Sequence, residues 1–95
     1  MEYILFIHNN MEQQPTDEQW IAFFEKATKS GMFNGGSEIG KSTILGSNDV
    51  TPVTNSAVGY MRFNTDNINE LHKLLELHPA HINGGTLELC ELPTT

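Results

Sequence analysis

The stretch Tyr3-Ile4-Leu5-Phe6-Ile7 decides the fold that this sequence predicts. It is too short for a stable helix and is rich in residues that favour strands, so it predicts a buried central β-strand. Its apolar residues occupy both alternating sets of positions and therefore face both sides of a sheet. We expect neither side of that sheet to be left open to water.

The residues that follow this strand predict a helix from about Thr16 to Gly31. Thr16 is a suitable N-cap, and Gln19, three residues later, completes a capping box. An apolar stripe follows at helical spacing and consists of Trp20, Phe23, Phe24 and Ala27. Gly31 is a natural stop, because glycine readily adopts the left-handed conformation that ends helices.

The middle of the chain predicts two more strands separated by a polar segment. Glu38 to Leu45 predicts a weaker strand, and Gly46 to Ser56 a loop or hairpin extension that contains Pro52. Ala57 to Phe63 predicts a second central strand. Its alternation places Val58, Tyr60 and Arg62 on one face, away from the helices.

The last third predicts a helix and a closing strand. Ile68 to His78 carries an apolar stripe, and Pro79 is expected to end the helix there. Thr86 to Leu92 alternates apolar and polar residues, which predicts the final strand. Asn34-Gly35-Gly36-Ser37 and Asn83-Gly84-Gly85-Thr86 each follow a helix and precede a strand, so the chain reads as two similar halves.

Two strand–helix–strand halves in series predict one α+β domain over residues 1–95, with a ferredoxin-like βαββαβ fold and an antiparallel sheet. Right-handed crossovers place both helices on one face of the sheet. The opposite face keeps apolar residues of the first strand, and an exposed apolar face predicts a partner. We expect a second copy, in a homodimer that pairs through the open sheet face. The alternative is a monomer in which Tyr3 and the ends of the strands are exposed to water at the edge of the sheet without destabilising it.

Composition and charge exclude several classes of protein. The 95 residues, 10.6 kDa, build one modest core. Five Lys and Arg against twelve Asp and Glu give a net charge of −7, which argues against nucleic-acid and anionic-membrane partners. One cysteine, Cys90, excludes an internal disulfide and a cysteine-rich zinc site. No segment suits a bilayer span or a signal peptide, so we expect a cytoplasmic protein.

Several segments together resemble a known family, and the resemblance covers nearly the whole chain. They are Met1 to His8, Trp20 to Lys29, Gly35-Gly36, Val58 to Met61, His78-Pro79-Ala80 and Gly84 to Leu89. On them the chain is similar to the YCII-related family, in particular to the branch named for an Asp-Gly-Pro-Phe (DGPF) motif. The resemblance implies ferredoxin-like subunits that pair through their sheets into a dimeric α/β barrel. Some members are suspected enzymes with a His and an Asp at the dimer cleft, and others are treated as small-ligand or regulatory modules.

The motif that names this branch is missing from the chain. Asn48 to Asn55 lies where the motif is expected, and it is shorter and lacks the Asp-Gly-Pro-Phe order. No role is therefore carried over to Asp49, and the catalytic expectation weakens.

Five residues are candidates for a ligand-binding site: His8, Tyr60, Arg62, Glu38 and His81. His8 ends the first strand and suits a general base or a ligand contact, because imidazole changes charge near neutral pH. Arg62 beside Tyr60 could hold a carboxylate, or could instead form an ion pair with Glu88 or Glu91. Glu38 is either an acid partner or a merely exposed strand residue.

Other motifs predict ordinary structural roles. His78 at a helix C-terminus predicts a partial positive charge that offsets the helix dipole. His78 and His81 do not predict a metal site, because Pro79 breaks the helix between them, and no cofactor is implied. Gly35 to Ser42 formally fits a phosphate-loop pattern, but it follows a helix and enters a strand, the reverse of what that loop needs.

The sequence thus leaves three functional hypotheses open. The first is a homodimer that binds a small organic molecule without catalysis. The second is an acid/base enzyme of the isomerase or hydrolase kind, with His8 or His81 as general base and Glu38 or Asp49 orienting it. The third is an interaction module whose sheet face mediates assembly only.

Overall fold

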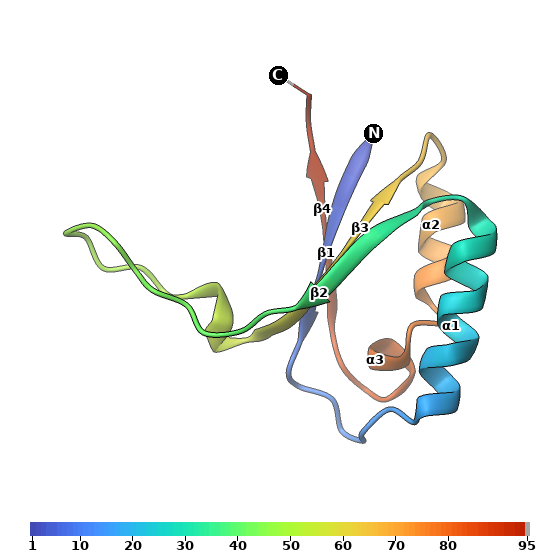
Figure 1. Ribbon diagram of the computed structural model, residues 1–95, viewed down its shortest axis with the longest axis horizontal. Helices are drawn as coiled ribbons and strands as arrows, with labels where there is room; N and C mark the ends of the chain where they lie inside the picture. The colour runs from blue at the N-terminus through green and yellow to red at the C-terminus, as the bar shows by residue number, and fades with distance from the viewer. Residues whose placement is uncertain (95) are drawn as a thin grey trace.

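The computed structural model describes residues 1–94. Within that part of the chain the elements alternate as two strand–helix–strand units, and Figure 1 shows them. They are β1 (Glu2–His8), α1 (Asp17–Ser30), β2 (Phe33–Glu38), the 3-10 turn η1 (Val53–Asn55), β3 (Ala57–Asn64), α2 (Ile68–Leu75), α3 (Pro79–Ile82) and β4 (Leu87–Leu92).

The strands form one sheet in the order β2-β3-β1-β4, and every neighbouring pair is antiparallel. β1 and β3 are the central strands, as the sequence predicts. Helices α1 and α2 lie on the same face of the sheet (Figure 1). The result is a small α+β protein whose topology is compatible with a ferredoxin-like fold.

Helix α1 begins and ends where the sequence predicts. The Thr16 hydroxyl accepts the backbone N–H of Gln19 at 3.1 Å, and the Gln19 side chain accepts the Thr16 N–H at 3.0 Å. This confirms the capping box, which satisfies two N–H groups that the helix itself leaves unpaired. Gly31 ends the helix in the left-handed conformation, with φ of 74°.

The core lies between the sheet and the helices. Each layer contributes large apolar side chains that are nearly or fully buried. They are Leu5 and Ile7 from β1, Met61 and Phe63 from β3, Phe23 and Ala27 from α1, Leu71, Leu74 and Leu75 from α2, and Ala80 from α3. The alternation of β3 is as predicted, since Met61 and Phe63 are buried while Val58 and Arg62 are exposed.

The prediction of a strand from Glu38 to Leu45 is wrong. Strand β2 covers Phe33–Glu38 instead, so it includes the glycines that were read as a turn. The register of β2 against β3 shifts between Phe33 and Gly36, and Gly35 has φ of 99° there. A side chain at Gly36 would collide with the carbonyl oxygen of Tyr60. The glycines therefore let the edge strand bulge and still pack closely on its neighbour.

The segment between β2 and β3 extends away from the sheet as an arm, residues 39–56 (Figure 1). This agrees with the loop or hairpin extension predicted for Gly46 to Ser56. Its apolar side chains face solvent in the single chain: Leu45 is 89% exposed and Val50 is 62% exposed. Ile44, which was assigned to the predicted strand, lies in this arm as well.

The second helix ends earlier than predicted. Helix α2 is capped by Asn67, whose side chain accepts the N–H groups of Asn69 and Glu70, and it ends at Leu75. Pro79 begins the short helix α3 rather than ending α2, because proline is tolerated at the first position of a helix. His78 is the N-cap of α3, so its predicted place at a helix C-terminus is wrong.

No helix among residues 1–94 is both long enough and apolar enough to cross a membrane.

Candidate functional site

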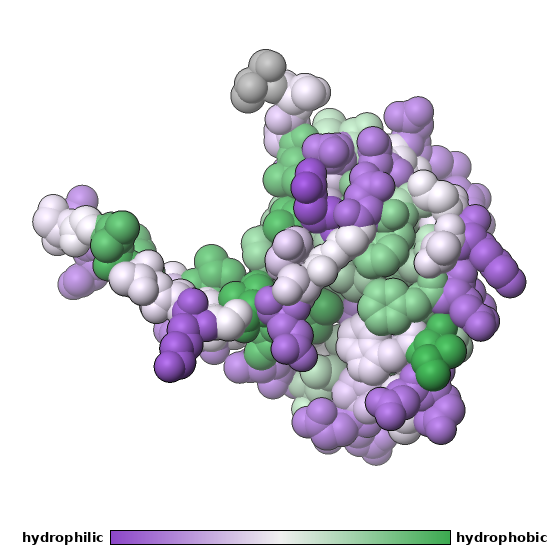
Figure 2. Space-filling model, in the orientation of Figure 1, coloured by the Kyte–Doolittle hydropathy of each residue, from purple (hydrophilic) through white to green (hydrophobic). Residues whose placement is uncertain are grey.

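A cavity of about 550 Å³ lies between α1, the loop after β1 and the edge of the sheet at β2 and β3. Its volume falls within the range of small-molecule sites, roughly 300 to 1,000 Å³. Figure 2 shows this part of the surface as a band of apolar and near-neutral side chains framed by hydrophilic ones. Its walls carry the side chains of Met11, Trp20, Phe24, Phe33 and Met61.

Two glycines keep the floor of the cavity clear. Gly36 of β2 and Gly59 of β3 both line it, and neither places a side chain there. A Cβ at Gly59 would meet Ile7 Cδ1 and the carbonyl oxygen of Ser37 at 3.4 Å, which is ordinary van der Waals contact. A Cβ therefore fits at this position, and further carbon atoms built on it would extend into the cavity and reduce its free volume.

The aromatic wall is continuous. The rings of Trp20 and Phe24 stack with their centroids 5.7 Å apart, as expected for residues four apart on one helix. The ring of Phe24 lies 5.8 Å from that of Phe33 on β2. Phe24 remains 41% exposed, so part of this wall is open to whatever enters the cavity.

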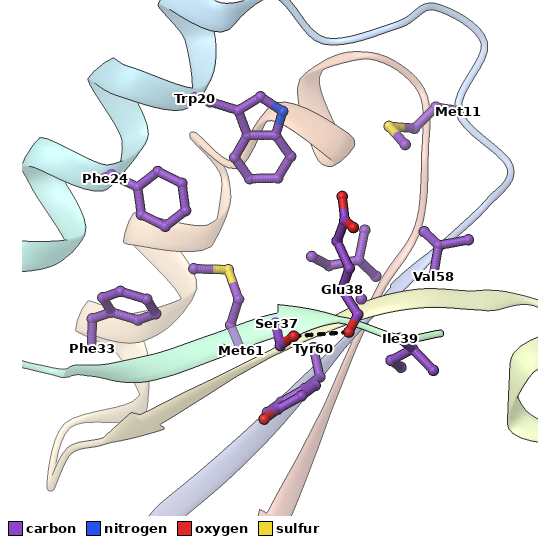
Figure 3. A pocket seen from close by; sticks show the side chains of 13 residues that line it. Met11, Trp20, Phe24, Phe33, Ser37, Glu38, Ile39, Val58, Tyr60 and Met61 are labelled. Atoms are coloured by element: carbon purple, nitrogen blue, oxygen red, sulfur yellow. Dashed lines mark hydrogen bonds between the residues drawn. The ribbon is translucent and has the colours of Figure 1, made fainter. Parts of the chain in front are cut away.

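Glu38 ends β2, and its side chain points into the cavity toward Trp20 and Met11 (Figure 3). It lies opposite Gly59 in the register of β2 and β3, on the helix side of the sheet. Among residues 1–94 its carboxylate has no hydrogen-bond or ion-pair partner; the backbone carbonyl of Glu38 is the group that accepts from Ser37. Tyr60 also lines the cavity, but its side chain points to the other side of the sheet (Figure 3).

The opposite face of the sheet holds three of the five predicted site residues. Tyr60 lies there within an apolar band, and His8 and Arg62 lie on either side of that band. That band pairs Phe6 with Tyr60 and Ile4 with Cys90 across the strands. Cys90 is a free thiol and is half-buried there.

A hydrogen bond of His8 and an ion pair of Arg62 flank the apolar band. Nε2 of His8 lies 2.8 Å from Oε1 of Glu88 on β4. The acid partner of His8 is therefore Glu88, and the assignment of Glu38 or Asp49 to that role is wrong. Arg62 Nη2 lies 3.5 Å from both carboxylate oxygens of Glu2, so Arg62 forms an ion pair within the sheet, but with Glu2 rather than with Glu88 or Glu91 of the same chain.

His81 lies apart from the other four predicted residues. It lines a second hollow of about 340 Å³ between α2 and the β1–β4 part of the sheet, together with His72 and Glu76. The described residues hold no cluster of three His, Cys, Asp or Glu side chains suited to a metal ion. The structure thus distributes the five candidates over three places rather than one.

His78 is fully buried and uncharged near neutral pH. Its Nδ1 accepts the N–H of Ala80 at 3.0 Å, and its ring packs edge-on against Trp20 and Phe23 with centroids 5.1 and 4.7 Å away. Desolvation by burial, and secondarily the nearby His81, lower the pKa of His78 to about 4. The predicted partial positive charge at this residue is therefore wrong, and its Nε2 has no hydrogen-bond partner in residues 1–94.

The cavity wall is the feature that sequence reasoning missed. The helical spacing of Trp20 and Phe24 is that of any buried stripe, so it does not distinguish a core residue from a residue of a cavity wall. Phe23 and Ala27 fill the core, while Trp20 and Phe24 occupy the flank of the stripe that faces the cavity. The stripe on α1 contains more aromatic side chains than the core takes up, and this excess was the available signal for a cavity wall.

Fold and cavity together define a small α+β protein with a helix-covered sheet and an aromatic-walled hollow at the sheet edge. No family model matches the chain, and no curated protein matches it. Among solved structures it is similar to 5-chloro-2-hydroxyhydroquinone dehydrochlorinase from Burkholderia phenoliruptrix AC1100, in complex with 2,5-dihydroxybenzoquinone. The two are 12% identical, the match covers 100% of this chain and 96% of the other, and the TM-score is 0.54. At this identity the likeness shows a shared fold.

Proposed function

We propose that this chain is a small-molecule-binding protein that acts as a homodimer, and that the cavity beside Trp20 is its ligand site. The observation that carries the proposal is the cavity itself: about 550 Å³, aromatic on one wall, clear at the floor and bearing one carboxylate. Natural ligand sites combine apolar lining with a few polar groups in this way. The fold-level likeness to a protein solved with a bound quinone is consistent with it.

The homodimer is supported by two exposed apolar surfaces. One is the band on the sheet face opposite the helices, where Ile4, Phe6 and Tyr60 are partly exposed. The other is the arm, with Leu45 and Val50 facing solvent. A second copy placed sheet to sheet covers the band through a two-fold contact, and the arms reach past the edge of each sheet. This is the dimeric α/β barrel expected for a YCII-related protein, and we propose that relationship with it.

A second candidate function rests on the His8–Glu88 pair. A carboxylate that holds an imidazole in one orientation is the arrangement a general base uses. In the proposed dimer this pair lies on the face that meets the partner, so the cleft between the sheets would be its site. This alternative is an isomerase- or hydrolase-like enzyme, and it predicts turnover that is lost on replacing His8.

The ligand site is tested by proton–nitrogen NMR titration with 2-phenylethanol, a neutral aromatic probe. Trp20 is the one tryptophan of the chain, so its indole N–H is a unique reporter. We expect a saturable shift of that resonance. Gly59→Val should abolish it by filling the floor, while Gly40→Val, at a glycine with open space around it, should leave it unchanged. An unsaturable or absent shift in the unmodified protein would overturn the assignment of the site.

Native mass spectrometry tests the dimer independently. We expect a mass of two chains under native conditions and of one chain after denaturation. A mass of one chain alone at micromolar concentration would contradict the sheet-to-sheet assembly. It would not contradict the proposal that the cavity is a ligand site.

A further inference from the structure

We propose that the cavity beside Trp20 takes an organic cation: an apolar or aromatic body against the ring wall and a protonated amine at Glu38. The inference rests on the proposed small-molecule-binding function and names the chemistry of its ligand. It places one charged contact and one ring contact in the same hollow, which is open to solvent at Glu38 and Phe24.

The charge in the cavity is of one sign. Glu38 is the acidic residue among the thirteen that line it, and none of those thirteen in the described chain is Lys, Arg or His. A carboxylate without a partner at the mouth of an apolar hollow attracts a cation and repels an anion. The net charge of −7 over the whole chain acts in the same direction.

The ring wall adds a second attraction for the same ligand. Trp20, Phe24 and Phe33 present a run of aromatic rings whose neighbouring centroids are 5.7 and 5.8 Å apart. The faces of such rings are electronegative and attract ammonium groups, with Trp the strongest. Glu38 points toward Trp20 across the cavity (Figure 3), so an ammonium group between them is attracted from both sides.

The thioether side chains of two methionines form the rest of the wall, which would contact the apolar part of the ligand. Met11 and Met61 line the cavity beside the rings. Methionine adapts its shape and makes favourable contacts with aromatic groups. The body of the ligand is therefore expected to be aromatic or branched aliphatic rather than sugar-like, because the wall offers it few hydrogen-bonding groups.

The test compares three probes of similar size and different charge: phenethylammonium, 2-phenylethanol and phenylacetate. Each is titrated at low ionic strength and followed by the Trp20 indole resonance. We expect phenethylammonium to bind about 2- to 5-fold more tightly than 2-phenylethanol, the range that a cation contact at a solvent-exposed site supplies. Phenylacetate should bind more weakly than either.

Glu38→Gln isolates the charge, because it keeps the shape of the side chain. The variant should lower phenethylammonium affinity to that of 2-phenylethanol and leave 2-phenylethanol unchanged. The matched control is Glu70→Gln, which removes the same charge at an exposed position in the first turn of α2. That control should keep the preference for the amine.

The outcomes separate this inference from the proposed function on which it rests. If the amine and the alcohol bind equally, or if Glu38→Gln leaves amine binding intact, the cation inference is overturned. The small-molecule site still stands in that case, provided that Gly59→Val blocks 2-phenylethanol. If no probe binds, the proposed function falls and takes the cation inference with it.

Discussion

Nε2 of His8 lies 2.8 Å from Oε1 of Glu88, joining the end of β1 to β4 on the sheet face opposite α1 and α2. The two residues are 80 positions apart in the sequence, and only the pairing of β1 with β4 brings them together. The Glu88 side chain is 58% exposed, so water screens the attraction between them.

The first prediction concerns this pair. In the dissociated chain, where the pair faces water, His8→Ala should change the free energy of unfolding by less than about 1 kcal/mol, because exposed pairs contribute little. Urea denaturation of the protein diluted below its dimer dissociation constant, followed by circular dichroism, measures it, with Glu88→Gln as the matching change on the other partner. A loss of several kcal/mol in either variant of the dissociated chain would contradict the prediction, whereas the proposed dimer is expected to lose more than the dissociated chain.

The second prediction concerns the open sheet face. Phe6→Glu places a charge in the apolar band and should raise the dimer dissociation constant at least about tenfold, through the cost of burying an unpaired carboxylate. Sedimentation velocity measures the change. Ile21→Glu is the control, since Ile21 is 60% exposed on α1, which covers the other face. Equal effects of the two substitutions would contradict the sheet-to-sheet assembly.

The third prediction is a pH dependence caused by His78. Its pKa is about 4 in the folded chain and 6.5 in the unfolded chain. As the pH falls from 6.5 to 4, the unfolded chain binds a proton that the folded chain excludes, so the free energy of unfolding decreases. The decrease is about 3 kcal/mol at most, and the contribution is constant above pH 6.5.

His78→Asn isolates this effect, because asparagine is a good N-cap and does not titrate. We expect the variant to be less stable than the parent at pH 7, since the smaller side chain leaves a void against Phe23. The difference in the free energy of unfolding between the variant and the parent should decrease as the pH is lowered to 4. Urea midpoints at pH 7, 5.5 and 4 measure it, and a gap independent of pH would exclude His78 as the titrating group.

The fourth prediction concerns a buried amide that joins α1 to α3. Asn83 Nδ2 donates to Gln19 Oε1 at 2.9 Å and to the carbonyl oxygen of Pro79 at 2.7 Å, and the residue is 8% exposed. Asn83→Ala should lower the free energy of unfolding by about 1–3 kcal/mol, because it removes both hydrogen bonds of this buried amide. Asn69→Ala, an exposed amide on α2, should cost less than half as much in the same thermal melt.

The fifth prediction compares two glycines with open space around them. Gly31 has φ of 74°, and Gly40 does not have a positive φ. Gly31→Ala should therefore destabilise the protein by about 1 kcal/mol through backbone strain. Gly40→Ala should be neutral or slightly stabilising, because it restricts only the unfolded chain. Thermal melts of both variants test the contrast, and a reversed order would contradict it.

The predicted elements that proved correct are those whose signals are local. The capping box of Thr16 and Gln19 and the stop at Gly31 each involve groups within one turn of the helix, so a short stretch of sequence contains all the partners. The alternation of β3 was equally readable, because successive side chains point to opposite faces. These signals also predicted that β1 and β3 are the central strands, and on which face Tyr60 and Arg62 lie.

The misplaced second strand shows where local signals fail. Asn34-Gly35-Gly36 has the composition of a turn, yet it pairs with β3 because the glycines permit a bulge and a close backbone approach. Ile44 and Leu45 look like strand residues but have no neighbouring strand, so they extend into the arm. The choice between the two segments depends on which one β3 can reach.

The sequence by itself determined the class of fold, the central strands, the boundaries of α1 and the presence of an unpartnered apolar sheet face. Only the tertiary structure decided which side chains meet: His8 with Glu88, Arg62 with Glu2, and Glu38 with the aromatic wall of Trp20 and Phe24. The physical reason is the separation along the sequence over which each kind of interaction acts. Caps and alternation act over a few residues, whereas a cavity and an ion pair form between strands and helices that the chain brings together only after it folds.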